Sequence, residues 1–220
     1  MIAKRFLSAL MAFTAATAFA SAAAQTESPG DVDAIVSRIQ ARNPSLQSFQ
    51  ARVRVNIRQT NFPWLAPKLD GTAYFKRPDN YEVVFDRVPS YAKGINKLFG
   101  NVTDPSSWRA DSNIAYDGIQ KIDGRQFYVL RLTKKIYSDQ LKDSYAYVDT
   151  ATYQVARMEF HYANGGDITM TQVYRNQGPF NVLSSQHAEI HIPHIRAVAD
   201  ASFGVYQTNV AVDDSVFTRK

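Results

Sequence analysis

The sequence predicts an α+β fold that is mainly β, in which a curved antiparallel sheet carries a few helices. The first observation is a strict alternation from Phe49 to Ile57, where Phe, Ala, Val and Ile take every second position between Gln, Arg and Asn. Successive side chains of a strand point to opposite faces, so this segment has one apolar face and one polar, cationic face. The second observation is that similar segments, bounded by turn-forming residues, continue to Val212. The third is that Tyr or Phe occurs in almost every one of them.

The first 24 residues are expected to be an export signal and not part of the fold. Lys4 and Arg5 precede an apolar run over residues 6–20, and residues 22–24 provide an Ala-x-Ala cleavage site. The run is shorter than the roughly 20 residues that a helix needs to span a bilayer. We therefore expect Gln25 at the mature N-terminus, a flexible lead-in over residues 25–31 and a single domain over residues 32–220. The expected location is the periplasm, in soluble form.

Composition excludes several classes of protein. The chain has no cysteine, which excludes disulfides, thiolate catalysis and lipid attachment through an N-terminal Cys. Its net charge of +5 falls to +3 when Lys4 and Arg5 leave with the signal. The remaining basic residues are spread along the strands and turns and do not form the single stripe of a nucleic-acid binder. We expect no nucleic-acid partner.

Residues 32–42 are expected to form the first helix. Asp31 or Asp33 can cap its N-terminus, and Asn43-Pro44 ends it. Its apolar positions recur at helical spacing and lie on one face; they are Val32, Ile35, Val36 and Ile39.

A second short amphipathic helix is expected over residues 91–99. Loops are expected on its C-terminal side, around Gly100-Asn101 and Asp104-Pro105 and on to Trp108. Gly94 in its middle costs about 1 kcal/mol relative to Ala. Its apolar positions are Tyr91, Ile95, Leu98 and Phe99.

The remaining periodic segments are expected to be strands. Residues 77–80 (RPDN) form a turn between the second and third strands. Asn164-Gly165-Gly166 predicts a hairpin, because these residues accept positive φ at little steric cost. After the strand that begins at Phe49, the expected strands cover residues 69–76, 81–86, 126–133, 144–149, 154–162, 167–176, 181–192 and 196–212.

Aromatic residues often occur in adjacent pairs, as in Tyr74-Phe75 and Phe127-Tyr128. Neighbours on a strand face opposite sides, so aromatic rings lie on both faces of the sheet, and the rings of each face need a packing partner or a ligand. Two short helices cover little of such a sheet. A curled sheet would then enclose an apolar cavity of the kind that binds small hydrophobic ligands. The alternative is that the rings fill a closed core.

No pattern in the sequence predicts catalytic residues, a metal site or a cofactor. His187 and His191 share a strand face but lie roughly 13 Å apart at 3.3 Å per residue, too far for one tetrahedral ion. His191 and His194 could form at most a two-ligand surface site. The G-x-S-x-G motif of serine nucleophiles and the glycine-rich phosphate-binding loop are absent from the sequence. An enzyme would need convergent polar groups, such as Glu159 and His161 on one strand face.

Several segments, in this order, resemble the periplasmic outer-membrane lipoprotein carrier family, the LolA-like proteins. The helix is followed by LQSFQA at residues 46–51 and by GTAYFKRPDNY at 71–81. Later segments that resemble the family are YVLRLTK at 128–134, DTATYQV at 149–155 and DDSVF at 213–217. The resemblance implies a highly curved antiparallel sheet, an unclosed β-barrel lidded by helices, with an apolar cavity for acyl chains. It also implies that Arg77 helps to hold the lid in the unliganded form and that Tyr81 lies near the cavity mouth.

The expected function is therefore a non-enzymatic carrier or binder of lipid acyl chains or of lipid-modified proteins. Its expected partners are a lipid or acylated lipoprotein cargo and a membrane-bound donor or acceptor protein. The alternative is an envelope sensor or scaffold that presents the 91–99 segment to a protein partner. Residues 77, 91, 95, 98 and 99 are the expected lid. The expected cavity residues are apolar and lie on alternate strand positions: Phe49, Val53, Val55, Ile57, Phe75, Tyr81, Val83, Phe85, Leu130, Met158 and Met170.

Overall fold

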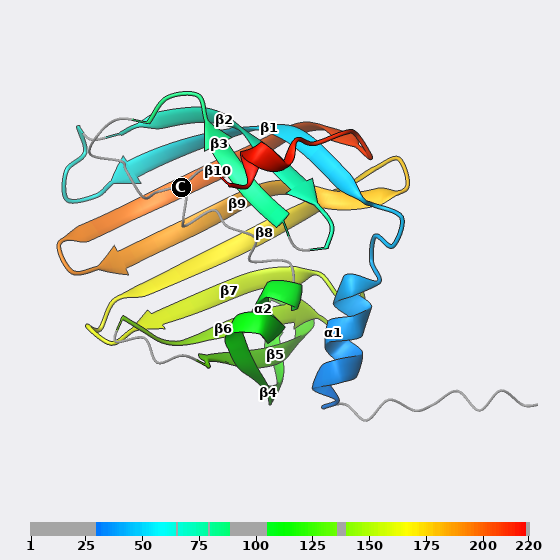
Figure 1. The fold of residues 1–220 in the computed structure, drawn as a ribbon. Coiled ribbons are helices and arrows are strands. Elements are labelled where there is room, and N and C mark those ends of the chain that lie inside the picture. Colours follow the sequence, from blue (N-terminus) through cyan, green and yellow to red (C-terminus); the bar gives the residue numbers. More distant parts are fainter. Residues whose placement is uncertain (1–29, 65, 79, 89–104, 136–139, 219–220) are drawn as a thin grey trace, which may run out of the picture.

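The protein was analysed as a computed structural model that describes residues 30–64, 66–78, 80–88, 105–135 and 140–218 (Figure 1). The expected signal, most of the lead-in and the expected helix at 91–99 lie outside these residues. The described elements are, in chain order, α1 (Val32–Gln40), β1 (Ser48–Gln59), β2 (Lys68–Lys76), β3 (Asn80–Phe85), α2 (Pro105–Asp111), β4 (Ser112–Ile122), β5 (Arg125–Lys134), β6 (Leu141–Asp149), β7 (Val155–Tyr162), β8 (Asp167–Gln177), β9 (Phe180–Ile192), β10 (Ile195–Thr208) and a 3₁₀ turn, η3 (Asp214–Val216).

The ten described strands form one antiparallel sheet in the order β3-β2-β1-β10-β9-β8-β7-β6-β5-β4. The first three strands are a meander, the other seven are a second meander, and the pairing of β1 with β10 joins them. β3 and β4 are the two edges, and the sheet curls without closing into a barrel (Figure 1). The predicted fold class, a highly curved antiparallel sheet with a few helices, is confirmed.

One face of the sheet, called the inner face below, packs against both helices. In β1 every second residue from Ala51 to Ile57 is buried, and these residues belong to the same core cluster as Ile35 of α1 and Trp108 of α2. The opposite, outer face is charged. Its cross-strand ion pairs include Arg52 with Asp86 at 2.6 Å. The alternation in the sequence therefore separates an apolar face, which lies under the helices, from a charged, solvent-exposed face.

Two buried aromatic residues of the outer face are covered by arginine. Phe127 and Tyr147 are buried there in a small separate cluster with Val129. The guanidinium of Arg125 lies 5.4 Å from the Phe127 ring centre, and that of Arg157 lies 5.5 Å from the Tyr147 ring centre. Cation–π contact and the arginine methylenes cover these two rings, which lie on the face opposite the two described helices.

Helix α1 begins and ends close to the predicted positions. The carboxylate of Asp31 accepts hydrogen bonds from the backbone N–H groups of Asp33 (2.9 Å) and Ala34 (3.2 Å), as an N-cap does. The buried residues of the helix are Ile35, Val36 and Ile39, so three of the four predicted apolar positions enter the core.

The segment after residue 104 differs from the expectation. A loop was expected from Asp104-Pro105 to Trp108, whereas residues 105–111 form α2, in which Trp108 is buried. A proline suits the first turn of a helix, but seven residues are too few to display helical periodicity. Strand β4 was also missed. Its register shifts between Tyr116 and Ile119, where Gly118 has φ +107°, and this bulge interrupts the alternation.

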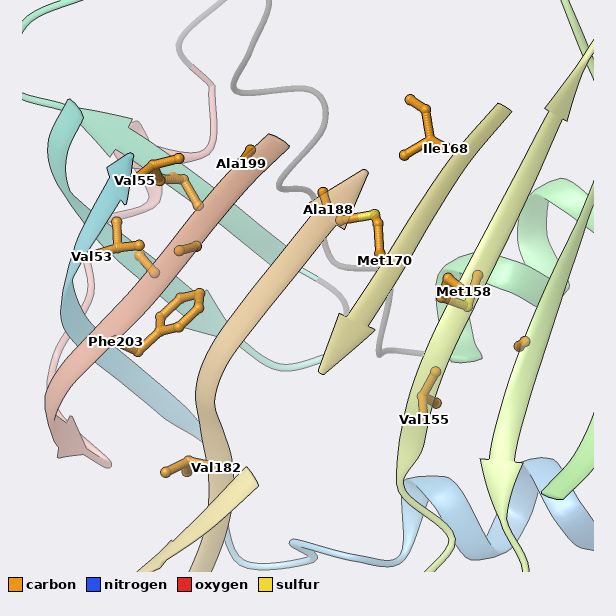
Figure 2. Packing of buried hydrophobic residues seen from close by; sticks show 14 of the residues in the cluster. Val53, Val55, Val155, Met158, Ile168, Met170, Val182, Ala188, Ala199 and Phe203 are labelled. Carbon is orange, nitrogen blue, oxygen red and sulfur yellow. The ribbon is translucent and has the colours of Figure 1, made fainter. Parts of the chain in front are cut away.

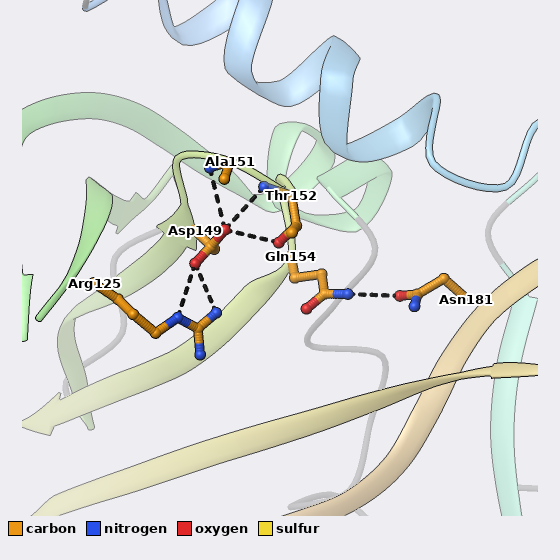
Figure 3. A network of polar contacts seen from close by, with 6 residues as sticks. All are labelled: Arg125, Asp149, Ala151, Thr152, Gln154 and Asn181. Carbon is orange, nitrogen blue, oxygen red and sulfur yellow. Dashed lines mark hydrogen bonds and ion pairs between the residues drawn. The ribbon is translucent and has the colours of Figure 1, made fainter. Parts of the chain in front are cut away.

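The turn between β6 and β7 is organised by the buried carboxylate of Asp149 (Figure 3). One oxygen accepts from the backbone N–H groups of Ala151 (3.1 Å) and Thr152 (2.9 Å) and from the Thr152 hydroxyl. The other accepts from Arg125 at 2.6 and 3.1 Å. Burial alone would raise the pKa of Asp149, but these hydrogen bonds outweigh it and hold the pKa below its ordinary value.

No helix among the described residues has the length and apolar character needed to cross a membrane.

Candidate ligand-binding face

The inner face is apolar across six strands that are neighbours in the sheet, in the order β1-β10-β9-β8-β7-β6 (Figure 2). At one end lies an aromatic cluster around Phe49, whose ring stacks on Phe75 at 5.3 Å and meets Tyr206 edge-on at 5.0 Å. Tyr81 approaches the same ring at 6.4 Å. The Tyr206 hydroxyl donates to the carbonyl of Leu183 at 2.8 Å. Burial raises the pKa of Tyr81 and of Tyr206, so both phenols are held neutral.

Methionines occupy the middle of the face. Met158 of β7 and Met170 of β8 lie directly opposite each other in the strand register, and each is 2 % exposed. Leu130 and Val155 belong to the same core cluster and are fully buried. Methionine is unbranched and polarisable, so its side chain adapts to irregular apolar partners.

The strands beside the methionines carry small inward side chains. β10 presents Ala197, Ala199 and Ala201, and β9 presents Ala188 opposite Ala199. An alanine methyl reaches only a short way from the backbone, whereas packed sheets normally fill a layer about 10 Å thick with large side chains. The layer of side chains is therefore thinner at these four alanines than at the aromatic cluster.

Two buried amides interrupt the apolar lining. Gln172 of β8 and Gln186 of β9 are directly opposite each other and are 6 % and 4 % exposed. Both lie on the inner face, because they continue the buried alternation of Met170 and Ala188.

Polar bonds fix the segment that connects α1 to β1. The guanidinium of Arg77 donates to the carbonyl oxygens of Leu46 at 2.6 Å and Asn43 at 2.8 Å. Asn43 and Asn181 are joined by two further hydrogen bonds of 2.8 and 3.0 Å. A planar guanidinium can hold two carbonyls at once, which an ammonium does less well. These contacts tie the end of α1 to the β2–β3 hairpin and to β9.

The structure places all the predicted cavity residues on or beside the inner face, without showing a ligand there. Seven are buried in the core cluster: Val53, Val55, Ile57, Val83, Leu130, Met158 and Met170. Three are partly buried and pack against it: Phe49, Tyr81 and Phe85. Phe75 is partly buried and stacks on Phe49. Among the predicted lid residues only Arg77 is described, and Tyr91, Ile95, Leu98 and Phe99 lie outside the described residues.

Of the histidines that the sequence singled out, His161, His187 and His191 lie on the outer face, and His194 lies in the turn between β9 and β10. His161 pairs with Asp143 at 2.7 Å, and His187 pairs with Asp200 at 2.6 Å. Glu159 does not join His161, since it accepts from the Tyr147 hydroxyl at 2.9 Å. Within the part of the chain that the structure describes, no three His, Cys, Asp or Glu side chains come together as a metal site.

Sequence reasoning missed the two glutamines and the alanines of the inner face. The signal for Gln172 was present, because in Ile168-x-Met170-x-Gln172 the period of two places the amide on the apolar side. A glutamine on that side of a strand needs a partner or a use. The alanines gave no such signal, since Ala is common on either face.

Solved structures with this architecture are known. The first is a DUF1329 family protein from Desulfovibrio piger, with 13% identity, a TM-score of 0.65 and coverage of 84% of this chain and 96% of that one. The second is a LolA superfamily protein from Nitrosomonas europaea, with 15% identity, a TM-score of 0.63 and coverage of 85% and 97%. The third is a domain from Vibrio parahaemolyticus described as a putative outer membrane lipoprotein-sorting protein, with 10% identity, a TM-score of 0.65 and coverage of 84% and 94%.

No protein-family profile matches the sequence, and no curated protein matches it. At this level of identity the structural similarity establishes the fold, and it does so over nearly the whole of each neighbour. The resemblance found in the sequence motifs is confirmed at that level.

Proposed function

Since the chain has the LolA-like fold, we propose that it is a non-enzymatic periplasmic carrier that holds the acyl chains of a lipid or of a lipid-modified protein against its inner face. The observation that carries the proposal is the lining itself: aromatic rings at one end, methionines in the middle, and alanines where a ligand would need room. Two structural neighbours support it, one described as a LolA superfamily protein and one as a putative outer membrane lipoprotein-sorting protein. The proposal includes export by residues 1–24 and one domain over 32–220.

Binding would require α1 and α2, the helices that pack on the inner face, to move. Leu130 and Val155 are fully buried, so water-sized space does not adjoin them in this state. Each methylene taken from water contributes about 0.8 kcal/mol, and a long chain can offset the loss of the contacts that it displaces. The ion pair between Arg109 of α2 and Asp33 of α1 is exposed and, at about 0–1 kcal/mol, opposes opening only weakly. Opening and closing of this cover would load and release the cargo without any covalent step.

The proposal is tested by native mass spectrometry of the gently purified protein and by uptake of a fluorescent fatty acid. A lipid adduct and saturable uptake are expected. Absence of both contradicts a carrier.

A pair of variants on β10 locates the uptake. Ala199→Leu adds bulk on the inner face, where Ala199 is 1 % exposed, whereas Val198→Leu adds it on the outer face of the same strand. The first should reduce uptake and the second should not. Equal effects would place the ligand elsewhere.

A second candidate, an envelope sensor or scaffold, is favoured by an exposed aromatic pair between β1 and β2. Phe62 and Trp64 are 41 % and 77 % exposed, and their ring centres are 5.7 Å apart. Exposed aromatic residues are typical of protein-docking sites. In this reading wild-type protein takes up no fatty acid, and Phe62→Ser with Trp64→Ser abolishes cross-linking to its envelope partner. A carrier instead keeps uptake in that double variant.

A further inference from the structure

The two inner-face glutamines have unused donor capacity. The single proton of the Tyr174 hydroxyl is shared between the Val155 carbonyl oxygen at 3.0 Å and the Gln172 Oε1 atom at 3.1 Å. The Gln172 Nε2 atom is buried and has no hydrogen-bond partner. The Gln186 Nε2 atom lies 3.6 Å from the Met170 sulfur, which is a weak acceptor. Two adjacent amides therefore offer N–H groups to which the residues that the structure describes supply no oxygen acceptor.

This arrangement is costly if it has no use. Buried polar groups are nearly always hydrogen-bonded, and an unpaired one loses the bonds that it made to water in the unfolded chain. Gln172 lies next to Met170 on the same face, and Gln186 faces Ala201 of β10. An apolar residue at either position would fit these neighbours better than an amide. The amides thus resemble the few polar groups that fix a ligand's orientation in an otherwise apolar pocket.

We infer that Gln172 and Gln186 form a recognition site for an acceptor oxygen of the ligand, the ester or amide carbonyl that joins an acyl chain to its head group. The inference rests on the proposed carrier function and adds the ligand class to it: acyl esters and amides in preference to plain hydrocarbons. The carbonyl lies between β8 and β9, and the chain runs over the neighbouring alanines and methionines.

The test compares two probes on the full-length protein. Diphenylhexatriene is a hydrocarbon with no acceptor, and a monoacylglycerol presents one ester and displaces it. The variant is Gln172→Met, which keeps the length of the side chain and removes both polar atoms. Met158→Leu is the matched control, because Met158 is an equally buried inner-face residue on the neighbouring strand β7.

Gln172→Met should weaken monoacylglycerol binding about tenfold, the effect of one lost hydrogen bond, and should leave the hydrocarbon affinity within about twofold. Met158→Leu should change both affinities by the same factor. Gln186→Met gives an independent readout of the same selectivity if the first variant folds poorly.

Equal effects of Gln172→Met and Gln186→Met on the two probes, or no effect on either, overturn the inference while the carrier function stands. Wild-type protein that binds neither probe overturns the carrier function, and the inference with it.

Discussion

Replacing Arg77 with leucine should loosen the segment that joins α1 to the sheet. The substitution removes the donors to Leu46 and Asn43, which lie at 2.6 and 2.8 Å. A hydrogen bond from a charged donor contributes about 1.5–3 kcal/mol. Water can replace part of this at a half-buried site, so we expect a loss of about 2 kcal/mol in the stability of the segment. Local opening should then become about 30-fold more frequent.

Native-state hydrogen exchange measures this opening directly. The backbone N–H groups of Leu46 and Gln47 are bonded to the Asn43 carbonyl (3.1 Å) and to the Asn209 side chain (2.8 Å), so both should be protected in the wild type. Their exchange should accelerate in Arg77→Leu, and fatty-acid uptake should accelerate with it if opening of the cover limits loading.

Arg52→Leu is the matched control, because it removes an exposed arginine from the outer face. Unchanged exchange at Leu46 and Gln47 in Arg77→Leu would refute the claim that the Arg77 hydrogen bonds stabilise the α1–β1 connection. Faster exchange with unchanged uptake would show that these hydrogen bonds stabilise the fold but do not control access of the ligand to the inner face.

Three further predictions concern stability. The pKa of Asp149 is held below its ordinary value, so the stability that its carboxylate contributes is present above about pH 4 and is lost as the pH falls through the folded-state value. Asp149→Asn should therefore lower the melting temperature at pH 7 and reduce the loss of stability between about pH 4 and lower pH, and Arg125→Leu should lower the melting temperature at pH 7 as well. Gly71→Ala should disrupt the β2–β3 pairing, because a Cβ atom there would lie 2.6 Å from the Val84 carbonyl oxygen; circular dichroism melting should show a loss of at least about 2 kcal/mol, and an unchanged melt would contradict it. Gln172→Met should leave the melting temperature unchanged or raise it, since it removes an unpaired buried amide; a lower melting temperature would show that the amide stabilises the fold.

Most of the sheet follows from the sequence because burial of one face imposes a period of two. The β1 alternation from Phe49 to Ile57 was sufficient to predict both the strand and its buried side, and β2, β3 and β5 to β10 were located within a few residues. Strand β4 was not located, because its bulge at Gly118 shifts the alternation to the other face. Helix α2 was not predicted either, because a helix of seven residues is too short to show a helical periodicity of apolar residues and is stabilised by the packing of Trp108.

The candidate site was predictable in composition but not in detail. Alternation alone assigned residues such as Val55 and Met170 to the apolar side. Which carbonyls Arg77 would bond depends on how the α1–β1 connection folds back on the β2–β3 hairpin, a long-range contact that no local pattern encodes. The facing of Gln172 and Gln186 depends on the β8–β9 register, which a bulge after Val173 shifts by one residue.

The central claim is that the inner face holds an acyl chain. The most direct measurement is photo-cross-linking of the purified protein with a fatty acid that carries a diazirine in its chain, followed by mapping of the adducts by mass spectrometry. The account predicts adducts on inner-face residues such as Met158, Met170 and Val55. Adducts confined to outer-face positions, such as Arg52 or Val198, or none at all, would contradict it.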